Sequence, residues 1–315
     1  MIHKVTQKYD KTQVLSLLDP IIREWFNKKF SNLTPPQAFA VPLIHNRENV
    51  LIASPTGSGK TLTAFLTIIN ELFILGRNDR LENKVYCVYI SPLKALANDI
   101  ERNLNQPLKE IYDLAAEKGI TLPKIRVGVR SGDTSPYEKQ KMVKTAPHIL
   151  ITTPETLAIV LSTTRFRENL RDVKYVIVDE IHEVCSSKRG VHLSVSLERL
   201  QYLISSNMHT APQPEEPEEE DEYEDGAVEV ISPVKLELTR IGLSATQAPI
   251  NEIARFLVGY NGRKLRDVHI IEALFGKQLD LKVLCPVQDM NLVPFEIVNA
   301  KMYQKLRDMI DLHRT

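Results

Sequence analysis

An eight-residue run rich in glycine and hydroxyl groups offers a place for phosphate. Its members are Ser54, Pro55, Thr56, Gly57, Ser58, Gly59, Lys60 and Thr61. The glycines permit backbone angles that turn amide N–H groups onto phosphate oxygens, and a helix starting at Lys60 would add its positive N-terminal dipole. Lys60 is placed to reach the β- and γ-phosphates, and the Thr61 hydroxyl to bind Mg²⁺. The strict pattern begins with glycine, where this chain has Ser54. The alternative is a plain turn between a strand and a helix.

A pair of carboxylates follows a buried apolar segment further along the chain. Residues 176–178 are Val-Ile-Val, and Asp179, Glu180, Ile181 and His182 come directly after them. An acid at the end of a buried strand is costly unless it holds a cation or accepts hydrogen bonds. Asp179 is suited to orient Mg²⁺ through water, Glu180 to act as general base on an attacking water, and His182 to sense the γ-phosphate. The alternative is that the two acids cap a helix.

A third polar segment, Ser244, Ala245 and Thr246, follows the predicted strand 236–243. Alone it carries little information, since a hydroxyl residue after a strand is usually a helix cap. Its place in the chain, after the glycine-rich run and the acid pair, completes a pattern of three motifs.

Short apolar strands that alternate with helices must position these motifs. The segments that we expect to be strands are Val50–Ala53, Val85–Ile90, Ile125–Val129, His148–Ile151, Tyr175–Val178 and Leu236–Leu243. Continuous apolar runs of about four to eight residues between helices are typical of a parallel sheet buried on both faces. The sequence therefore predicts an α/β fold with a doubly wound, mostly parallel sheet covered by helices on both faces. Ligands of such a sheet bind at the carboxyl ends of its strands.

The boundaries of this domain follow from changes in the pattern. Residues 1–48 are expected to be helical, and residues 49–265 to form the sheet domain. Residues 266–315 predict a connector, with an edge strand at 279–284 and a terminal helix at 300–313.

The acidic residues are unevenly distributed. The chain holds 40 Lys and Arg against 40 Asp and Glu, but residues 212–226 hold nine acids and no base. The remaining sequence therefore carries 40 bases and 31 acids, a net charge of +9. That charge could attract a polyanion, or the basic side chains could simply solvate the surface. Because the acidic run cannot bury apolar area, we expect a disordered insertion over residues 205–233.

The composition excludes two classes of protein. No window of about 18 apolar residues, the length that suggests a membrane-spanning helix, is present. The cysteines are Cys87, Cys185 and Cys285. No pair of them has metal-ligand or redox spacing, and their odd number argues against a disulfide scaffold. A reducing, cytoplasmic location is the expectation that follows.

Several segments, taken in order, resemble the first RecA-like domain of superfamily 2 helicases. They are the glutamine element LTPPQ at 33–37, GSGKT at 57–61, motif Ia at 91–96, motif Ib at 152–157, DEIH at 179–182 and SAT at 244–246. More specifically, RSGDT at 130–134 and KRGVHL at 188–193 resemble the Lhr (large helicase-related) family, and we expect an archaeal member. The resemblance spans about residues 20 to 315.

The resemblance implies a nucleotide and a metal ion. ATP would be held by the glycine-rich run and by Gln37, which reads adenine through both faces of its amide. Mg²⁺ would lie on Thr61 and Asp179. The aromatic residue that stacks on adenine is not fixed by spacing, because Phe26 and Phe30 are both candidates and both could also be core.

The resemblance also implies a groove that holds one strand of nucleic acid by its backbone. The residues expected to line it are Ser91, Pro92, Lys94, Arg130, Gly132, Asp133, Thr134, Thr152, Thr153, Pro154 and Glu155. Ser244 and Thr246 would couple the nucleotide to this groove. Phosphate contacts carry no base information, so sequence-independent binding of single-stranded DNA or RNA is implied.

The resemblance implies a second RecA-like domain with arginine fingers, and we expect these 315 residues to be a fragment that stops before it. The resemblance implies 3′-to-5′ translocation by the two domains together, and an isolated first domain that binds ATP but does not unwind duplex. One alternative is a DEAD- or DEAH-type RNA helicase domain, against which the segment 188–193 argues. Another is a non-catalytic ATP-switch scaffold, which would not need both Lys60 and Glu180.

Overall fold

The computed structural model describes most of the chain. The described residues are 1–92, 94–206, 237–245, 249–273, 283–287, 289 and 292–312, with the backbone alone at 94–99 and 102. The chain divides into two compact units, Met1–Phe275 and Gly276–Thr315. The acidic run 212–226 and most of the edge strand predicted at 279–284 lie outside the described residues.

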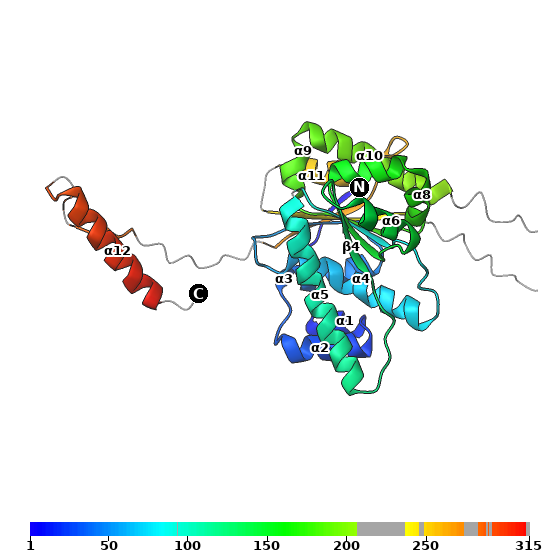
Figure 1. The fold of residues 1–315 in the computed structure, drawn as a ribbon, viewed down its shortest axis with the longest axis horizontal. Helices are drawn as coiled ribbons and strands as arrows, with labels where there is room; N and C mark the ends of the chain where they lie inside the picture. The colour runs from blue at the N-terminus through cyan, green and yellow to red at the C-terminus, as the bar shows by residue number, and fades with distance from the viewer. Residues whose placement is uncertain are drawn as a thin grey trace, which may run out of the picture. The chain divides into compact units, whose positions relative to one another are not determined.

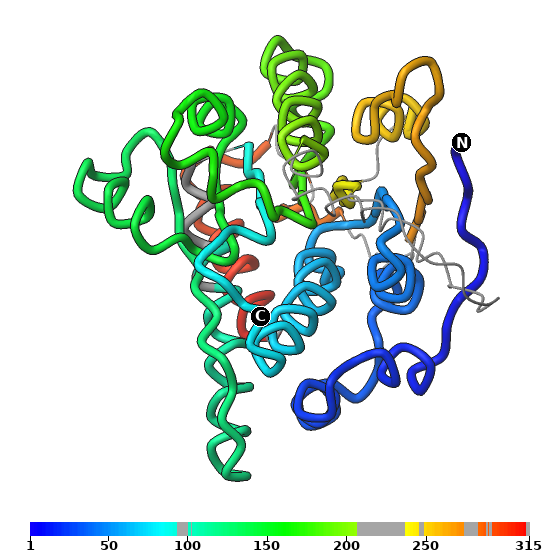
Figure 2. Tube along the Cα trace, turned by 90° about the vertical axis from the view of Figure 1, so that its right-hand side faces the viewer, coloured from blue at the N-terminus to red at the C-terminus, as the bar shows by residue number. Residues whose placement is uncertain are grey.

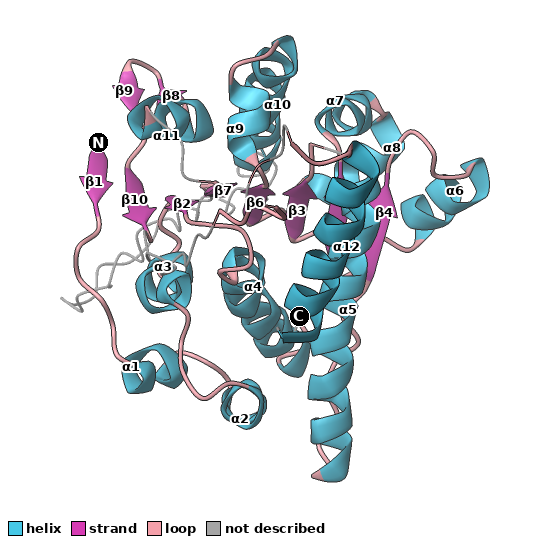
Figure 3. Cartoon of the chain, turned by 90° about the vertical axis from the view of Figure 1, so that its left-hand side faces the viewer, coloured by secondary structure: helices cyan, strands magenta, loops and turns pink. Residues whose placement is uncertain are grey.

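Within the described residues, the first unit is built around one sheet of eight strands whose neighbours all pair in parallel. The strands are β1 (Ile2–Lys4), β2 (Val50–Ala53), β3 (Cys87–Ile90), β4 (Val127–Arg130), β5 (Ile149–Thr152), β6 (Tyr175–Val178), β7 (Thr239–Ser244) and β10 (Val268–Glu272). Their order across the sheet is β1-β10-β2-β7-β6-β3-β5-β4. A separate antiparallel pair consists of β8 (Tyr260–Asn261) and β9 (Lys264–Leu265). Helices cover both faces of the large sheet, as Figure 3 shows, and the predicted doubly wound α/β fold is confirmed.

Alternate residues along the central strands divide the core into two layers. Val50 and Ile52 belong to one apolar cluster, and Leu51 between them belongs to the other. The first cluster is covered by α1 (Lys11–Ser16), α2 (Pro20–Lys29), α3 (Pro35–His45), α4 (Lys60–Arg77) and α5 (Lys94–Glu117). The second is covered by α7 (Pro154–Ser162), α9 (Ile181–Cys185), α10 (Lys188–Ser205) and α11 (Ile250–Val258). Figure 2 shows the two sets on opposite sides of the strands.

Two strands depart from the sequence prediction. β1 lies in a region predicted to be helical, and it pairs with β10, where Ile2 is opposite Val268. β10 also pairs with β2, where His269 is opposite Val50, so the sheet includes residues beyond the boundary predicted at 265. A strand of three residues is too short for a periodic signal, and a pairing over such a sequence separation leaves no local pattern.

The remaining helices are short or lie in the second unit. α6 (Pro136–Lys144) follows β4, and α8 (Thr164–Arg167) follows α7. The second unit contains α12 (Phe295–Leu312), drawn in red in Figure 1, where the sequence predicts a helix from residue 300. None of the described helices combines the length and the apolar character that crossing a membrane requires.

The helices α9 and α10 meet at a tight corner. The N–H and the hydroxyl of Ser187 both donate to the carbonyl oxygen of Val184, at 3.0 and 2.9 Å. Gly190, in the first turn of α10, lies so close to α9 that a Cβ atom there would be 2.3 Å from the same oxygen. Only glycine fits this position, and its absence of a side chain lets the two helices approach.

Gly190→Ala should destabilise the domain, because the added methyl group would overlap a backbone atom. Overpacking of this kind costs about 1–3 kcal/mol, which lowers the Tm of a domain of this size by roughly 2–12 °C. Circular dichroism during heating measures the shift. Val191→Ala is the matched control, since the Val191 side chain is 68 % exposed, and its Tm should stay close to that of the parent. An unchanged Tm in the Gly190→Ala variant would contradict the predicted overlap.

Candidate functional site

The run predicted to bind phosphate forms the turn between β2 and α4. Gly57 and Gly59 have φ angles of +75° and +85°, in the left-handed region that residues with a side chain rarely adopt. Gly59 is also the N-cap of α4, a helix of 18 residues. Ser54, which replaces the first glycine of the pattern, makes a hydroxyl–hydroxyl hydrogen bond with Ser58. The turn thus gathers backbone N–H groups and the positive end of a helix dipole, an arrangement that suits an anion.

The side chain of Lys60 folds back into this loop. Its ammonium donates hydrogen bonds to the carbonyl oxygens of Ser54 and Pro55, the second at 3.2 Å, and 7 % of the residue is exposed. Burial lowers the pKa of Lys60, while the charges of Glu180 and Asp179 oppose that shift. A buried cation at the start of a helix is placed to exchange carbonyl oxygens for those of a phosphate.

Polar groups from two strands surround Asp179, which stands directly after β6. Its N–H donates to the carbonyl oxygen of Ile90 at 2.9 Å, and its carboxylate accepts the Tyr89 hydroxyl and the Glu180 N–H. Burial raises the pKa of Asp179, and the hydrogen bond from Tyr89 works against that rise. Sequence analysis missed Tyr89, whose signal is a hydroxyl group one position before the end of an otherwise apolar strand.

Glu180 has a backbone conformation that is rare for a residue with a side chain. Its φ and ψ are +42° and 44°, in the left-handed region. Such conformations cost about 1–3 kcal/mol and cluster at functional sites. Burial and the charge of Asp179 raise the pKa of Glu180. The carboxylate therefore binds a proton more readily than an ordinary glutamate, which suits a general base.

His182 joins the ends of two neighbouring strands. Its Nδ1 lies 3.2 Å from the Ser244 hydroxyl oxygen and 3.5 Å from the Glu180 carboxylate. Ser244 ends β7, which lies between β2 and β6, and its carbonyl oxygen accepts the N–H of Ser54 at 3.1 Å. The three sequence motifs therefore meet at one edge of the sheet. Thr246, predicted to act with Ser244, lies outside the described residues.

A cavity of about 480 Å³ lies where these groups meet. The phosphate loop, the first turn of α4 and the two acids contribute to its walls, together with Trp25, Lys29 and Phe30. Asn103 and Gln106 of α5 also line it. Small-molecule sites have volumes of about 300–1,000 Å³, so this cavity could hold a nucleotide. Of these lining residues, Phe30 is a candidate from the sequence, whereas the sequence motifs include none of Trp25, Lys29, Asn103 and Gln106.

The structure separates the candidates for the base end of the nucleotide. Phe26 is fully buried, whereas Phe30, whose ring centre is 4.9 Å from that of Phe26, lines the cavity. Gln37 is not among the lining residues. It is 1 % exposed, and its Oε1 accepts the N–H of Thr34 at 2.8 Å. In this conformation the Gln37 side chain caps the N-terminus of α3.

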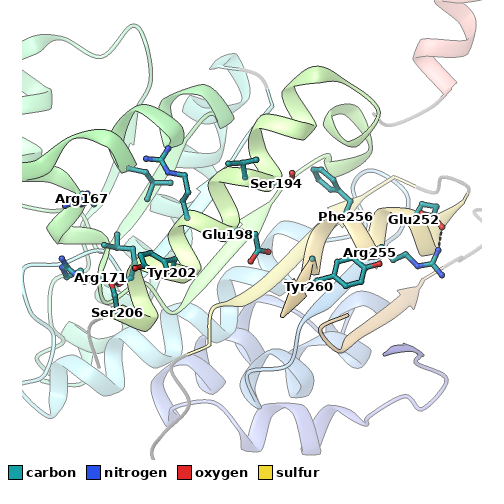
Figure 4. Close-up of a pocket in the computed structure, with 15 residues that line it drawn as sticks. Arg167, Arg171, Ser194, Glu198, Tyr202, Ser206, Glu252, Arg255, Phe256 and Tyr260 are labelled. Carbon is teal, nitrogen blue, oxygen red and sulfur yellow. Dashed lines mark hydrogen bonds and ion pairs between the residues drawn. The ribbon is translucent and has the colours of Figure 1, made fainter. Parts of the chain in front are cut away.

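A larger hollow of about 1120 Å³ lies over α10 and α11 (Figure 4). Glu198 and Tyr202 of α10 and Arg255 of α11 are among its lining residues. No residue that the sequence assigns to nucleotide or nucleic acid is among them. Size alone would select this hollow, but the smaller cavity gathers the glycine-rich loop and the buried charges, and we assign the nucleotide site to it.

The segments predicted to line a nucleic-acid groove follow β3, β5 and β4, which are neighbours in the sheet. The Ser91 N–H donates to the carbonyl oxygen of Thr152 at 2.9 Å, and the Thr152 hydroxyl donates to that of Arg130 at 2.8 Å. The Thr134 hydroxyl accepts the N–H of Ser131 at 2.9 Å. These hydroxyl groups hold the loops together, so the exposed loop backbone is what remains for contact with phosphates.

Exposure divides the other predicted groove residues. Gly132, Asp133 and Glu155 are exposed, whereas Pro92, Thr153 and Pro154 are buried. The side chain of Lys94 lies outside the described part of the chain.

Arg130 is predicted to contact phosphate, but its guanidinium lies inside the protein. The residue is 8 % exposed, and the guanidinium carbon lies 4.4 Å from the ring centre of Phe166. Its Nη1 donates to the carbonyl oxygen of Lys139 at 3.3 Å. A planar, weakly hydrated guanidinium stacks on an aromatic ring with a small desolvation cost. In this conformation the Arg130 side chain connects the end of β4 to α6.

Comparison with known proteins identifies relatives of the chain. Residues 34–253 match the DEAD/DEAH box helicase family. The chain is 47 % identical to the ATP-dependent helicase Lhr-Core of Methanothermobacter thermautotrophicus and 44 % identical to that of Saccharolobus solfataricus. These matches cover 100 % and 98 % of this chain but 33 % and 31 % of those proteins. The chain therefore spans about a third of the length of these relatives.

Solved structures agree with these matches. The structure of Mycobacterium smegmatis helicase Lhr bound to ssDNA and AMP-PNP is similar with a TM-score of 0.72 and 37 % identity, over 96 % of this chain and 34 % of that one. Mss116p bound to ssRNA and AMP-PNP has a TM-score of 0.60 and 18 % identity, over 86 % of this chain and 47 % of that one, and shares the fold alone. The chain belongs to the DEAD/DEAH box helicase family, and the Lhr proteins that its sequence resembles are among its relatives.

Proposed function

We propose that this chain is the ATP-binding motor domain of an ATP-dependent helicase of the Lhr type. It couples ATP hydrolysis to 3′-to-5′ movement along single-stranded nucleic acid. The observation that carries the proposal is the cavity in which the phosphate loop shares its walls with Asp179 and Glu180. A phosphate-binding loop and a general base in one cavity are the two parts that hydrolysis of a nucleoside triphosphate requires.

Each polar group of the cavity has a separate task in this proposal. Backbone N–H groups of the glycine-rich loop and the ammonium of Lys60 hold the phosphates. Glu180 accepts a proton from the water that attacks the γ-phosphate, and its raised pKa supports that role. His182, in contact with Glu180 and Ser244, connects the state of the site to β7.

The donor set also fits Mg²⁺. The Thr61 hydroxyl and the Asp179 carboxylate are hard oxygen ligands, and both residues line the cavity. Mg²⁺ keeps several waters and is usually held by one or two carboxylates together with substrate phosphates, so this small set suffices. Bound there, the ion would neutralise charge on the phosphates. Tyr89 orients the Asp179 carboxylate for this task.

The base end of the nucleotide involves one aromatic and one amide side chain. Phe30 stacks on the adenine in this proposal, because it lines the cavity while Phe26 is buried. Reading of the adenine by both faces of the Gln37 amide requires that amide to release the N–H of Thr34. Nucleotide binding and the start of α3 are coupled in this way.

The single strand lies along the loops that follow β3, β4 and β5. Contacts to phosphates carry no base information, so both DNA and RNA are acceptable strands in the proposal. The partner domain is a second RecA-like domain of a longer protein, consistent with the third of its relatives' length that this chain spans. That domain supplies an arginine finger, which is worth about 10³–10⁵ in rate in other phosphoryl-transfer systems.

Two other functions are less well supported. A DEAD-type RNA helicase would resemble Mss116p, yet the identity to Mss116p is 18 % against 47 % to an Lhr-Core protein. A scaffold that uses ATP only as a switch has no need for a general base. The backbone of Glu180 is held in a costly conformation beside the phosphate loop, which favours a catalytic role.

Lys60→Ala should abolish tight ATP binding, because it removes the cation that faces the terminal phosphates. Glu180→Gln should keep binding and lose turnover, since an amide cannot accept the proton of water. Titration with a fluorescent ATP analogue measures binding, and phosphate release by a protein that includes the second domain measures turnover. Glu183→Gln is the control for loss of a nearby negative charge and should keep both. Normal turnover in Glu180→Gln would place the base elsewhere.

Tyr89→Phe should make Mg²⁺-dependent nucleotide binding more sensitive to acid. The Tyr89 hydroxyl lowers the pKa of Asp179, which burial raises. Without it the carboxylate takes up a proton at higher pH, so binding that is present above this pKa is lost earlier as the pH falls. The measurement is analogue affinity against pH. Tyr86→Phe is the matched control, because the Tyr86 hydroxyl donates to the Arg80 carbonyl oxygen. The same loss of analogue affinity at low pH in both variants would contradict the role of Tyr89.

The 315-residue chain alone should bind ATP and single strands weakly and should not separate duplex strands. One domain offers half of a groove and no arginine in trans to stabilise the transferring phosphoryl group. Its affinity for a strand should fall steeply with salt, because the contacts are to phosphates. A strand-displacement assay on a 3′-tailed duplex is the measurement. Robust ATP-dependent unwinding by this chain would contradict the need for a second domain.

A further inference from the structure

One arginine joins two of the loops that the proposed function places along the nucleic-acid strand. Arg189 lies in the first turn of α10. Its Nε donates to the Glu155 carboxylate at 2.6 Å, and its Nη2 donates to the carbonyl oxygen of Pro92 at 2.7 Å. Glu155 is in the first turn of α7, and Pro92 is in the loop after β3. A single planar group therefore connects its own helix to two segments that lie 34 and 97 positions away in the chain.

The start of α10 is itself anchored to the nucleotide site. Gly190 packs against the carbonyl oxygen of Val184 at the end of α9, and Ser187 donates twice to the same oxygen. The N-cap of α9 is Glu180, the proposed general base. The corner between α9 and α10 therefore fixes where the Arg189 guanidinium lies relative to Asp179 and Glu180.

The contact with Arg189 also changes the charge that the groove presents. Glu155 is exposed, and a free carboxylate there would repel a phosphate backbone. Burial raises the pKa of Glu155, but hydrogen bonds, chiefly from Arg189, more than offset this and hold the pKa below its ordinary value. The carboxylate is therefore ionised and paired. An arginine fork can hold a carboxylate and a carbonyl oxygen at once, which the point charge of a lysine does less well.

We infer that Arg189 is a positioning residue for the nucleic-acid strand. It fixes the Pro92 loop and the first turn of α7 relative to each other and neutralises the Glu155 carboxylate, so that both segments accept a phosphate backbone. The inference rests on the proposed binding of single strands and adds a residue outside the three motifs. Through the corner between α9 and α10, this residue links the ATP cavity to the grip on the strand.

Three roles for Arg189 predict different measurements. A direct phosphate contact contributes about 0.7 to the slope of log affinity against log salt on a single strand, whereas a positioning residue contributes nothing to that slope. A residue that only stabilises the fold would lower Tm and nucleotide affinity together. If Arg189 acts through Glu155, the two substitutions are not additive. The effect of Arg189→Ala on strand affinity is then smaller when Glu155 is also alanine.

The experiment uses the 315-residue chain, a labelled oligothymidylate and a fluorescent ATP analogue. Arg189→Ala should bind the strand about tenfold more weakly, as misplacement of a binding group does, and should bind the analogue without strand as the parent does. In the Glu155→Ala background, Arg189→Ala should lower the affinity for the strand by less than about threefold. The slope of log affinity against log salt should stay the same. Arg199→Ala is the matched control, because it removes the same charge from α10 where the side chain contacts Ser162, and its strand affinity should equal that of the parent.

Two results would overturn the inference while the proposed function stands. One is a strand affinity of Arg189→Ala equal to that of the parent. The other is a salt slope lower by about 0.7 in the Glu155→Ala background, which would make Arg189 a phosphate contact. A parent chain that binds no strand overturns the proposed function instead. Amide hydrogen exchange at the start of α7 then tests the clamp by itself, since it should be faster in Arg189→Ala, and unchanged exchange would show that no clamp exists.

Discussion

Two buried charges, Lys60 and Asp179, and the half-buried Glu180 lie at one edge of an apolar sheet, and the groups around them have to stabilise them. Burial alone lowers the pKa of Lys60 and raises those of Asp179 and Glu180. The attraction between Lys60 and the two acids, and the Tyr89 hydroxyl beside Asp179, oppose these shifts, whereas the charge of Asp179 adds to the rise at Glu180. A buried ion cluster repays its desolvation only when geometry is good and the remaining lone pairs are hydrogen-bonded. The strands, the glycine-rich loop and the left-handed Glu180 together supply that geometry.

The order of the strands converts three separate sequence motifs into one site. β7 lies between β2 and β6, so the residue that ends it is next to both the phosphate loop and the acid pair. Ser244 uses this position twice, through its carbonyl oxygen toward Ser54 and through its hydroxyl toward His182. A movement of the phosphate loop can therefore be transmitted through Ser244 to His182 and the acid pair.

The sequence predicted what depends on local pattern and missed what depends on distant pairing. The glycine-rich turn, the acid pair and the central strands each have a signal within a few residues, and the fold class followed from their alternation. β1 has no such signal, because the partner that the described sheet gives it is the distant β10. Arg189 and Tyr89 act through residues from other segments, so their neighbours are visible only in the folded chain. Arg130 shows the opposite error, since a basic residue in a loop suggests an anion contact until Phe166 is seen beneath it.

The place of β1 has a consequence for folding during synthesis. Among the strands that the structure describes, β1 pairs with β10 alone, and Ile2 must wait for Val268. At about 5–20 residues per second, the partner leaves the ribosome roughly 13–53 s after the first strand. During that interval β1 has no partner strand and the edge of β2 that β10 covers is open, and other chains can pair with such an edge. Pairing of this part of the sheet is therefore a late event, because β1 and β2 are joined only when β10 takes its place between them.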